Sequence, residues 1–239
     1  MREVFYLRKM QSAARRAITD FNLIEDNDAV AVGVSGGKDS LTLLYVLAAM
    51  RVYMPQKFTV KALMLDLGYK CDTSEFERFC EKIDVECIIK QTDVANVVFD
   101  VRHEKNPCSL CAKMRRGALN ELAVESGCNK VALGHHFDDV IETFYMSLIY
   151  EARLSCFDAK SYLDRVGVTV IRPLIYIEEK DIINFAEREK LPIIHNPCPA
   201  DGFTKRQYVK NLLADLERDN PDVKHRIFRA VREGLLLKK

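Results

Sequence analysis

The sequence Val-Ser-Gly-Gly-Lys-Asp-Ser occupies residues 34–40, at the end of the apolar run 29–34, and this junction decides the fold. Leucines follow it at helical spacing, so the pattern predicts a buried strand, a tight turn and a helix. Such a junction gathers backbone N–H groups at a helix N-terminus, where they bind anions. We therefore predict a phosphate-binding loop, in which Gly36 and Gly37 let the backbone approach the anion and Lys38 adds a positive charge.

This loop differs from the P-loop of nucleoside triphosphatases. That motif has four residues between its first glycine and its Gly-Lys pair, and Ser or Thr after the lysine. Here three residues separate Gly33 from Gly37, and Asp39 follows Lys38. The segment Ser35–Ser40 instead resembles the pyrophosphate loop of enzymes that split ATP between its α and β phosphates. The alternative is a glycine-rich turn without a ligand, which the small and polar residues at the helix start disfavour.

The composition is that of a soluble globular protein, since 48% of the 239 residues are apolar and 30% are charged. This length predicts one or two domains with a large core. No segment approaches the run of about 20 apolar residues that spans a bilayer. The N-terminal region has basic residues along a helical pattern and lacks the apolar core of a signal peptide. We expect a cytoplasmic protein that does not associate with membranes.

Charge is unevenly distributed along the chain, although the net charge is only +1. Residues 1–16 carry five basic groups against Glu3, and residues 203–239 carry ten basic groups against five acidic ones. A basic stripe of this kind can follow nucleic-acid phosphates. Because a solvated helix face has the same pattern, charge alone leaves nucleic-acid binding open.

Short apolar segments alternate with helical patterns through most of the chain. The expected strands are 29–34, 59–65, 86–90, 130–133 and 170–172. The expected helices are 4–21, 38–50, 74–83, 109–126, 138–150, 178–190, 204–218 and 223–237, with a looser excursion over 151–169. This rhythm predicts right-handed βαβ crossovers. The expected fold class is α/β, with a parallel five-stranded sheet, helices on both faces and a helical C-terminal extension.

Several polar residues follow the expected strands. The phosphate loop follows the first, Asp66 the second, and Gly134 and His135 the fourth. Ligands of parallel sheets lie beyond the carboxyl ends of the strands. We therefore expect these residues to meet in one nucleotide site.

The cysteines fall into two groups. A cytoplasmic chain of this size predicts no disulfide framework. Cys108 and Cys111 open a helix on which residues three apart share a face, and the helix N-terminus and nearby basic residues favour their thiolate forms. This pair alone is typical of a redox, zinc or iron–sulfur site. Five others have no informative spacing and are interpreted as inert buried thiols, namely Cys71, Cys80, Cys87, Cys128 and Cys156.

A third cysteine, Cys198, bears on the choice between a redox, a zinc and an iron–sulfur site. A zinc site normally needs a second Cys-x-x-Cys pair, and the sequence contains none. Cys198 lies in a proline-flanked loop before a basic helix. Three thiolates leave one metal position open, and in a 4Fe–4S cluster that iron could hold an external sulfur or a substrate. The alternative is that Cys108, Cys111 and Cys198 are unrelated core thiols.

Two carboxylates follow the fourth expected strand, in the segment Gly134-His-His-Phe-Asp-Asp139. Carboxylate oxygens beside a phosphate loop suit Mg²⁺, which is often shared with substrate phosphates. Alternatively, Asp138 or Asp139 is a helix N-cap. The two histidines could form a transition-metal site, but we expect one to pack near the nucleotide and the other to be a hydrogen-bonded core residue.

These motifs together match one family. In chain order they are Ser35–Ser40, Cys108–Cys111 followed by Arg115-Arg-Gly117, Leu133–Asp139, Ile171-Arg-Pro-Leu174 and Cys198. Over residues 5–215 the chain resembles the tRNA 2-thiocytidine synthetase group of PP-loop tRNA thiolases, with the thiolases of tRNA thymidine as close relatives. The resemblance implies an adenine nucleotide α-hydrolase-like fold. Its PP-loop ATP-pyrophosphatase domain would span 26–175, between an N-terminal helix at 1–25 and a helical extension at 176–239.

The resemblance also implies the chemistry. ATP would adenylate a base carbonyl, with cytidine C2 the expected position, and sulfur carried on a 4Fe–4S cluster would displace AMP. The expected partners are tRNA and a sulfur donor, such as a cysteine desulfurase or free sulfide, and the expected assembly is a homodimer. The residues of the implied ATP site are Ser35, Gly36, Gly37, Lys38, Asp39, Ser40, Asp66, Gly134 and His135. The implied catalytic or Mg²⁺-binding residues are Asp39, Arg115 and Asp139. The implied ligands of the cluster are Cys108, Cys111 and Cys198.

The chain departs from the family's pattern, and two alternatives remain. It is short, and its region beyond Asp201 has no signature that assigns a particular nucleotide. The first cysteine of the chain is Cys71, so the flanking zinc-finger cysteines of the thymidine thiolases are absent. A ligase resembling tRNA lysidine synthetase would also adenylate a carbonyl, but its chemistry needs no sulfur, and the three placed cysteines count against it. A non-catalytic nucleotide-binding regulatory module would leave both the carboxylates and the cysteines without a role.

Overall fold

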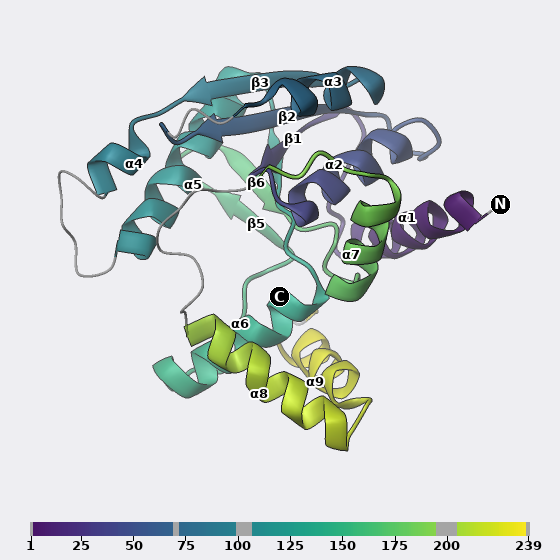
Figure 1. Cartoon of the computed structure of the whole chain (residues 1–239), viewed down its shortest axis with the longest axis vertical. Helices are drawn as coiled ribbons and strands as arrows, with labels where there is room; N and C mark the ends of the chain where they lie inside the picture. Colours follow the sequence, from purple (N-terminus) through teal and green to yellow (C-terminus); the bar gives the residue numbers. More distant parts are fainter. Residues whose placement is uncertain (1, 69–71, 99–106, 195–204, 238–239) are drawn as a thin grey trace.

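A central sheet organises the computed structural model, which describes residues 2–68, 72–98, 107–194 and 205–237 (Figure 1). Its strands are β1 (Asp28–Val34), β2 (Phe58–Asp66), β3 (Glu86–Gln91), β4 (Lys130–Ala132), β5 (Lys160–Leu163) and β6 (Val168–Ile171). Their order is β3-β2-β1-β4-β6-β5. All neighbouring pairs are parallel except β5 and β6. In the middle of the sheet, Val32 of β1 pairs with Ala62 on one side and with Ala132 on the other.

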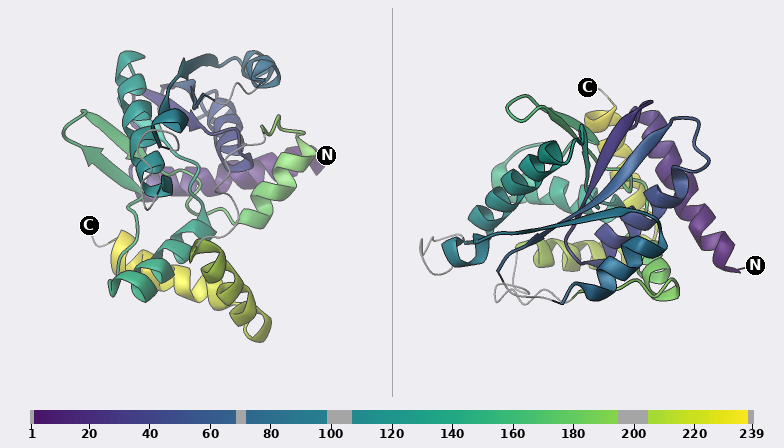
Figure 2. Two further views of the ribbon diagram at one scale, coloured as in Figure 1. Left: turned by 60° about the vertical axis from the view of Figure 1, so that its left-hand side comes forward. Right: turned by 90° about the horizontal axis from the view of Figure 1, so that it is seen from above.

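Helices cover both faces of this sheet (Figure 2). They are α1 (Arg2–Asp20), α2 (Lys38–Met50), α3 (Ser74–Lys82), α4 (Val94–Asn96), α5 (Pro107–Glu125), α6 (Phe137–Glu151), α7 (Glu179–Arg188), α8 (Lys205–Asp219) and α9 (Val223–Val231), followed by the π-helical turn η2 (Arg232–Leu236). Leu122 and Ala123 of α5 pack on one face, against Ala31, Leu63 and Val131. The larger core, which includes α1, α2 and α7, lies on the other face.

The expected α/β class, with helices on both faces and a helical C-terminus, is confirmed, but the expected five strands are wrong because the sheet has six. The additional strand is β5, inside the stretch 151–169 that the sequence presented as a loose excursion. It is a short edge strand, and Tyr162 is 62% exposed. A half-exposed strand of four residues carries little apolar periodicity, which is why its sequence gave no strand signal.

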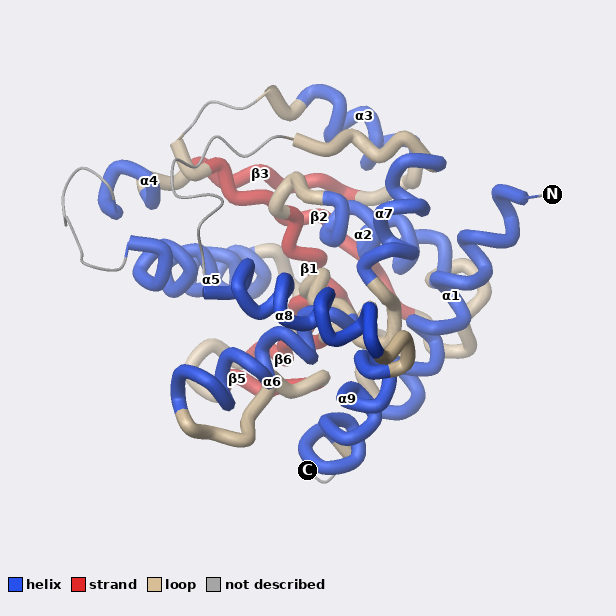
Figure 3. Tube along the Cα trace, turned by 60° about the horizontal axis from the view of Figure 1, so that its bottom comes forward, coloured by secondary structure: helices blue, strands red, loops and turns tan. Residues whose placement is uncertain are grey.

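The carboxyl end of β1 leads into α2 through residues 35–37, and that of β4 leads into α6 through residues 133–136. Figure 3 shows α8 and α9 beside α6. Strand β1 is an almost wholly buried apolar segment, as expected for a parallel strand covered on both faces. Helices α8 and α9 pack on α6, so the C-terminal part of the chain lies beside the sheet edge where ligands are expected. Within the described ranges, no helix is both long and apolar enough to cross a bilayer.

Candidate functional site

The predicted phosphate loop is held by its own hydroxyls and by a distant segment. The Ser40 hydroxyl donates to the carbonyl of Gly37 at 2.9 Å and accepts from the Ser35 N–H at 3.2 Å. Gly36 has a φ of +83°, which favours glycine, and its carbonyl accepts from the N–H of Ile194 at 3.0 Å. The loop is therefore fixed before any ligand arrives.

Gly37 has a different reason to be glycine. Its φ of −80° suits any residue, and a Cβ built on it would lie 3.5 Å from the Ser35 hydroxyl, an ordinary contact. Neither conformation nor packing within the chain requires glycine here. The open position is what close approach of a phosphate to the backbone would require.

Gly134 holds the end of β4 against the start of α2. A Cβ at Gly134 would lie 2.9 Å from the carbonyl carbon of Asp39 and 3.0 Å from the nitrogen of Ser40. Both are backbone atoms and cannot rotate away. The glycine thus brings the Gly134-His135 segment and the phosphate loop into direct contact.

A cavity of about 460 Å³ opens at this junction. Ser35, Asp39 and Ser40 line it from the phosphate loop, and Arg115 and Arg116 line it from α5. Other residues that line the cavity are Asn120, Gly134, His135 and Asp139. Seven of the residues proposed from the sequence therefore meet in one cavity: Ser35, Asp39, Ser40, Arg115, Gly134, His135 and Asp139.

Other proposed residues lie elsewhere. The carboxylate of Asp66, at the end of β2, accepts from the N–H of Gly68 at 2.9 Å, and Asp66 does not line the cavity. Gly36, Gly37 and Lys38 belong to the same loop but are also outside the cavity lining. Asp66 is thus engaged in the turn that follows its own strand.

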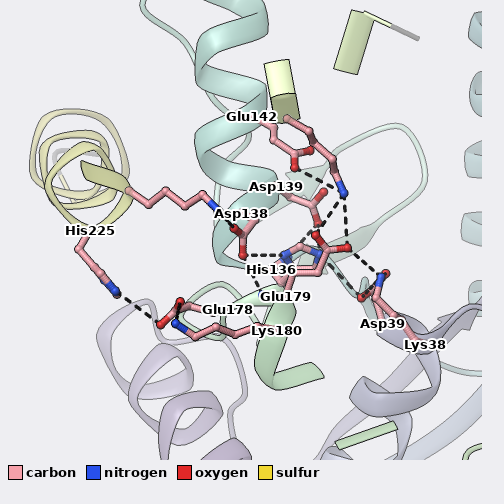
Figure 4. A network of polar contacts seen from close by, with 12 residues as sticks. Lys38, Asp39, His136, Asp138, Asp139, Glu142, Glu178, Glu179, Lys180 and His225 are labelled. Carbon is pink, nitrogen blue, oxygen red and sulfur yellow. Dashed lines mark hydrogen bonds and ion pairs between the residues drawn. The ribbon is translucent and has the colours of Figure 1, made fainter. Parts of the chain in front are cut away.

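The carboxylates of Asp39 and Asp139 face the same buried imidazole (Figure 4). Nε2 of His136 lies 3.7 Å from Oδ1 of Asp39 and 3.5 Å from Oδ2 of Asp139. Oδ1 of Asp39 is buried and accepts no hydrogen bond, but Nζ of Lys38 lies 3.3 Å from it and forms an ion pair with it. Two converging carboxylates are a donor set that suits Mg²⁺.

Both aspartates at the start of α6 also hold the fold. The Asp139 carboxylate accepts from the His136 N–H at 3.1 Å and so caps the helix, while Asp138 accepts from the Glu179 N–H at 2.7 Å. The sequence offered Asp138 or Asp139 as the helix N-cap, but the N-cap residue is His136, and Asp139 is the third helical residue in a capping box. A cap at this position still leaves Asp139 facing the cavity.

Two cations from α8 complete the site, and the sequence did not single them out. Arg206 donates from Nη1 to Asp139 at 2.7 Å and to Glu142 at 3.1 Å. Lys210 lies 3.2 Å from Glu179, which also binds Lys38 of the phosphate loop at 3.0 Å. The signal available in the sequence was the basic character of residues 203–239, which gave no indication of partners.

Burial and neighbouring charges shift the pKa values of three groups at this site. Burial raises the pKa of Glu142 to about 7, against the opposing effect of Lys210 and Arg206. Burial also lowers the pKa of His135 to about 4, so its imidazole is neutral at physiological pH. For Glu179, burial opposes ionisation, but Lys38 and Lys210 outweigh it and lower the pKa to about 2.

His135 is the histidine that lines the cavity, and His136 is the buried one. The ring centroid of His135 lies 4.9 Å from that of Phe157. The two rings are tilted by 39°, and the neutral imidazole would offer an uncharged surface to a bound base. His136, in contrast, is held between the carboxylates.

The cysteine triad is only partly described. Cys111 lies on the first turns of α5, partly buried, directly before Ala112 of the cavity lining. The side chain of Cys108 and all of Cys198 lie outside the described residues. Among the described residues, no group of three or more His, Cys, Asp or Glu side chains is arranged to hold a metal ion.

None of the remaining cysteines that the structure describes lines the cavity. Cys80 and Cys128 are buried, and Cys87 and Cys156 are partly buried, while Cys71 lies outside the described residues. Burial raises the pKa of the Cys128 thiol, which favours the unreactive protonated form.

Fold and site define an α/β nucleotide-binding protein of the PP-loop class, and residues 8–216 match the PP-loop domain. The chain is 39% identical to a tRNA-cytidine(32) 2-sulfurtransferase of Geobacter metallireducens, covering 94% of this chain and 89% of the relative. A protein of the same name from Pelobacter propionicus is 37% identical, with 97% and 87% coverage. The chain belongs to the tRNA 2-thiocytidine synthetase-like family of PP-loop tRNA thiolases.

A solved structure agrees with this assignment. The chain is similar to the U34-tRNA thiolase NcsA from Methanococcus maripaludis, a structure that holds a [4Fe-4S] cluster. The TM-score is 0.79 at 27% identity, covering 95% of this chain and 78% of the other. The family and the enzyme class expected from the sequence, an ATP-dependent tRNA sulfurtransferase, are confirmed.

Proposed function

We propose that this enzyme adenylates the C2 carbonyl oxygen of a tRNA cytidine, at position 32 as in its named relatives, and replaces that oxygen with sulfur. The observation that carries the proposal is the 460 Å³ cavity. There the phosphate loop, two carboxylates and two arginines meet next to the helix turn that carries Cys111. The names of the curated relatives favour cytidine over uridine and sulfur transfer over ligation.

The first half-reaction uses the phosphate loop. The backbone of residues 35–40 and the start of α2 would bind the ATP phosphates, and Lys38 would add a positive charge. Asp39 and Asp139 would hold Mg²⁺, whose charge would stabilise the departing pyrophosphate. This assignment fits the position of both carboxylates on the cavity wall.

The second half-reaction needs stabilisation of the activated base. Arg115 and Arg116 line the cavity from α5, and Arg115 lies about one helical turn after Cys111. A guanidinium at this place would stabilise negative charge that develops as AMP leaves. Arg115 is therefore proposed as the catalytic cation.

Cys108, Cys111 and Cys198 would hold a 4Fe–4S cluster. Thiolates are the usual ligands of such clusters, and a cluster with three protein ligands supplies one open iron where sulfur can bind. The structural fit rests on the position of Cys111 directly before the cavity residue Ala112.

The overall reaction balances without an external oxidant when the donor provides sulfide. The cytidine oxygen attacks the α-phosphorus of ATP, and pyrophosphate leaves. Sulfide then forms a bond to C2, the C2–O bond breaks, and the oxygen departs with AMP together with one proton. The products are 2-thiocytidine in tRNA, AMP and pyrophosphate.

The test is anaerobic incubation of the protein with tRNA, ATP, Mg²⁺ and sulfide, followed by mass spectrometry of the nucleosides and quantification of AMP. We expect 2-thiocytidine and AMP in equal amounts. AMP release without any thiolated nucleoside would contradict sulfur transfer. Thiolation confined to uridine would overturn the assignment of the base.

A further inference from the structure

A second cavity, of about 220 Å³, lies between α1, the start of α6 and the C-terminal helix α9. It shares no lining residue with the cavity at the phosphate loop. Its lining consists of Arg16, Phe137, Tyr176, Glu178, His225, Phe228, Arg229 and Arg232. The reaction described above uses none of these side chains.

Aromatic rings form the base of this cavity. The rings of Phe137 and Phe228 stack with centroids 4.5 Å apart, and Tyr176 meets Phe228 edge-on at 5.8 Å. All three side chains are buried. The Tyr176 hydroxyl donates to Asp20 at 2.8 Å, which holds the ring in place. The base of the cavity is therefore rigid.

Arginines form its rim. The Arg16 guanidinium lies over the Tyr176 ring, with Cζ 4.3 Å from the centroid. Within the described ranges, Arg16 and Arg229 have no carboxylate within ion-pair distance, and Arg232 reaches only Glu233, at 3.5 Å. Three guanidiniums thus face the cavity with little neutralisation.

The carboxylate that lines the cavity is already engaged. Glu178 pairs with Lys180 at 2.6 Å and lies 3.5 Å from Nε2 of His225. Its charge is therefore compensated by groups other than the three arginines, and the cavity keeps an excess of positive charge.

The two basic ends noted in the sequence meet at this place. Arg16 comes from residues 1–16, and Arg229 and Arg232 come from residues 203–239. The cavity lining joins α1 to α9, so segments more than two hundred residues apart contribute to one surface. This convergence distinguishes the cavity from an ordinary solvated helix face, which carries its charge on one element.

We propose that this cavity binds a phosphate of the tRNA backbone, at a distance from the nucleotide that is modified. Guanidiniums donate paired hydrogen bonds that match phosphate oxygens. The cavity is smaller than the roughly 300–1,000 Å³ of typical small-molecule sites, so it suits one phosphate group of a macromolecule rather than a free nucleotide. The proposal rests on tRNA being the substrate.

The experiment measures tRNA affinity as a function of salt, with fluorescently labelled tRNA and the full-length protein. The test variant is the double substitution Arg16→Gln/Arg229→Gln. The matched control is Arg218→Gln/Arg226→Gln, which removes the same charge from α8 and α9 at exposed positions outside the cavity. Circular dichroism and ATP affinity are measured for both variants to verify folding and an intact phosphate loop.

We expect the cavity variant to bind tRNA at least about tenfold more weakly than the wild type, with a log–log salt slope smaller by about one to two. The control should lose less than about threefold, and Arg16→Lys/Arg229→Lys should retain more affinity than the Gln variant. Equal losses in the cavity and control variants would overturn the proposal, because only the general positive field would then matter. If the wild-type protein binds no tRNA, the proposed function itself fails.

Discussion

Arg206 of α8 donates to Oδ1 of Asp139 on α6 at 2.7 Å, across 67 residues of sequence. The same Nη1 donates to Glu142 at 3.1 Å, so one guanidinium fixes two carboxylates of the first two turns of α6. Because Asp139 also lines the cavity, the C-terminal helix sets the position and charge of a group proposed to act in the reaction. A divalent cation at Asp139 would have to share the carboxylate with this arginine.

Replacement of Asp139 should impair adenylation more than stability. Asp139→Ala removes a capping contact, which costs about 1 kcal/mol, and a partly exposed ion pair with Arg206, which costs up to about 1 kcal/mol. Loss of a transition-state contact costs at least about 2.7 kcal/mol. The measurements are AMP formation per folded molecule and the free energy of unfolding in urea. Asp222→Ala, at the start of α9, is the control for a helix-start carboxylate outside the cavity. A destabilised Asp139→Ala protein with wild-type turnover per folded molecule would leave capping as its only role.

The two loop glycines should respond differently to substitution. Gly37→Val should weaken ATP binding strongly without unfolding the protein, because the position has an ordinary φ and room for a Cβ. Gly36→Ala should lower the free energy of unfolding by about 1–2 kcal/mol, since its φ is +83°. A Cβ there would also lie 2.9 Å from that of Ile194. Calorimetric ATP titration and thermal unfolding of both variants give the comparison, and unchanged ATP affinity in a folded Gly37→Val protein would refute the phosphate-loop assignment.

The three proposed cluster ligands should behave as one unit. Alanine variants of Cys108, Cys111 and Cys198 should each lose iron, sulfide and thiolation together, because a cluster with three protein ligands has none to spare. ATP binding should persist in all of them, since the phosphate loop lies on a different element. The measurement is iron and sulfide content per chain after anaerobic purification.

The other five cysteines are the matched controls for that series. Their alanine variants should retain the cluster, and Cys80→Ala and Cys128→Ala should show stability losses because both thiols are buried. Full iron content in Cys198→Ala, with loss in Cys108→Ala, would exclude Cys198 as the third ligand. Absence of iron from every preparation would instead favour a persulfide–disulfide pair at Cys108 and Cys111.

Glu142 should make stability fall as the pH rises. Its pKa is raised by burial to about 7 in the folded protein, so the folded state holds a proton that the unfolded state releases at a lower pH. The wild type should therefore lose stability between about pH 4.5 and 7 through this group. Glu142→Gln should remove that loss and be more stable than the wild type at pH 8, by at most on the order of 3 kcal/mol.

Urea unfolding of both proteins at pH 5 and pH 8 checks this expectation. The difference between them should be larger at pH 8 than at pH 5. If Glu142→Gln is less stable than the wild type at pH 8, the ion pairs of Glu142 with Arg206 and Lys210 outweigh its burial, and the direction of the pKa shift is wrong.

The sequence by itself determined the phosphate loop, the positions of the five parallel strands and most helices. These features depend on spacing along the chain: an apolar run ending at glycines, and apolar residues at strand or helix periodicity. It also placed Gly134 and His135 correctly at the carboxyl end of a strand, because parallel connections bring such ends together. The sequence did not predict the edge strand β5, because none of its side chains is fully buried and its apolar periodicity is therefore weak.

Only the tertiary structure decided which side chains meet between elements. The pairing of Arg206 with Asp139 follows from how α8 packs on α6, and Arg16 and Arg229 line one cavity because α1 and α9 both border it. Asp66 shows the converse, since its carboxylate binds its own turn rather than lining the cavity. Local spacing fixes the face of an element on which a residue lies. The partner opposite that face depends on how the apolar surfaces of distant segments are buried together.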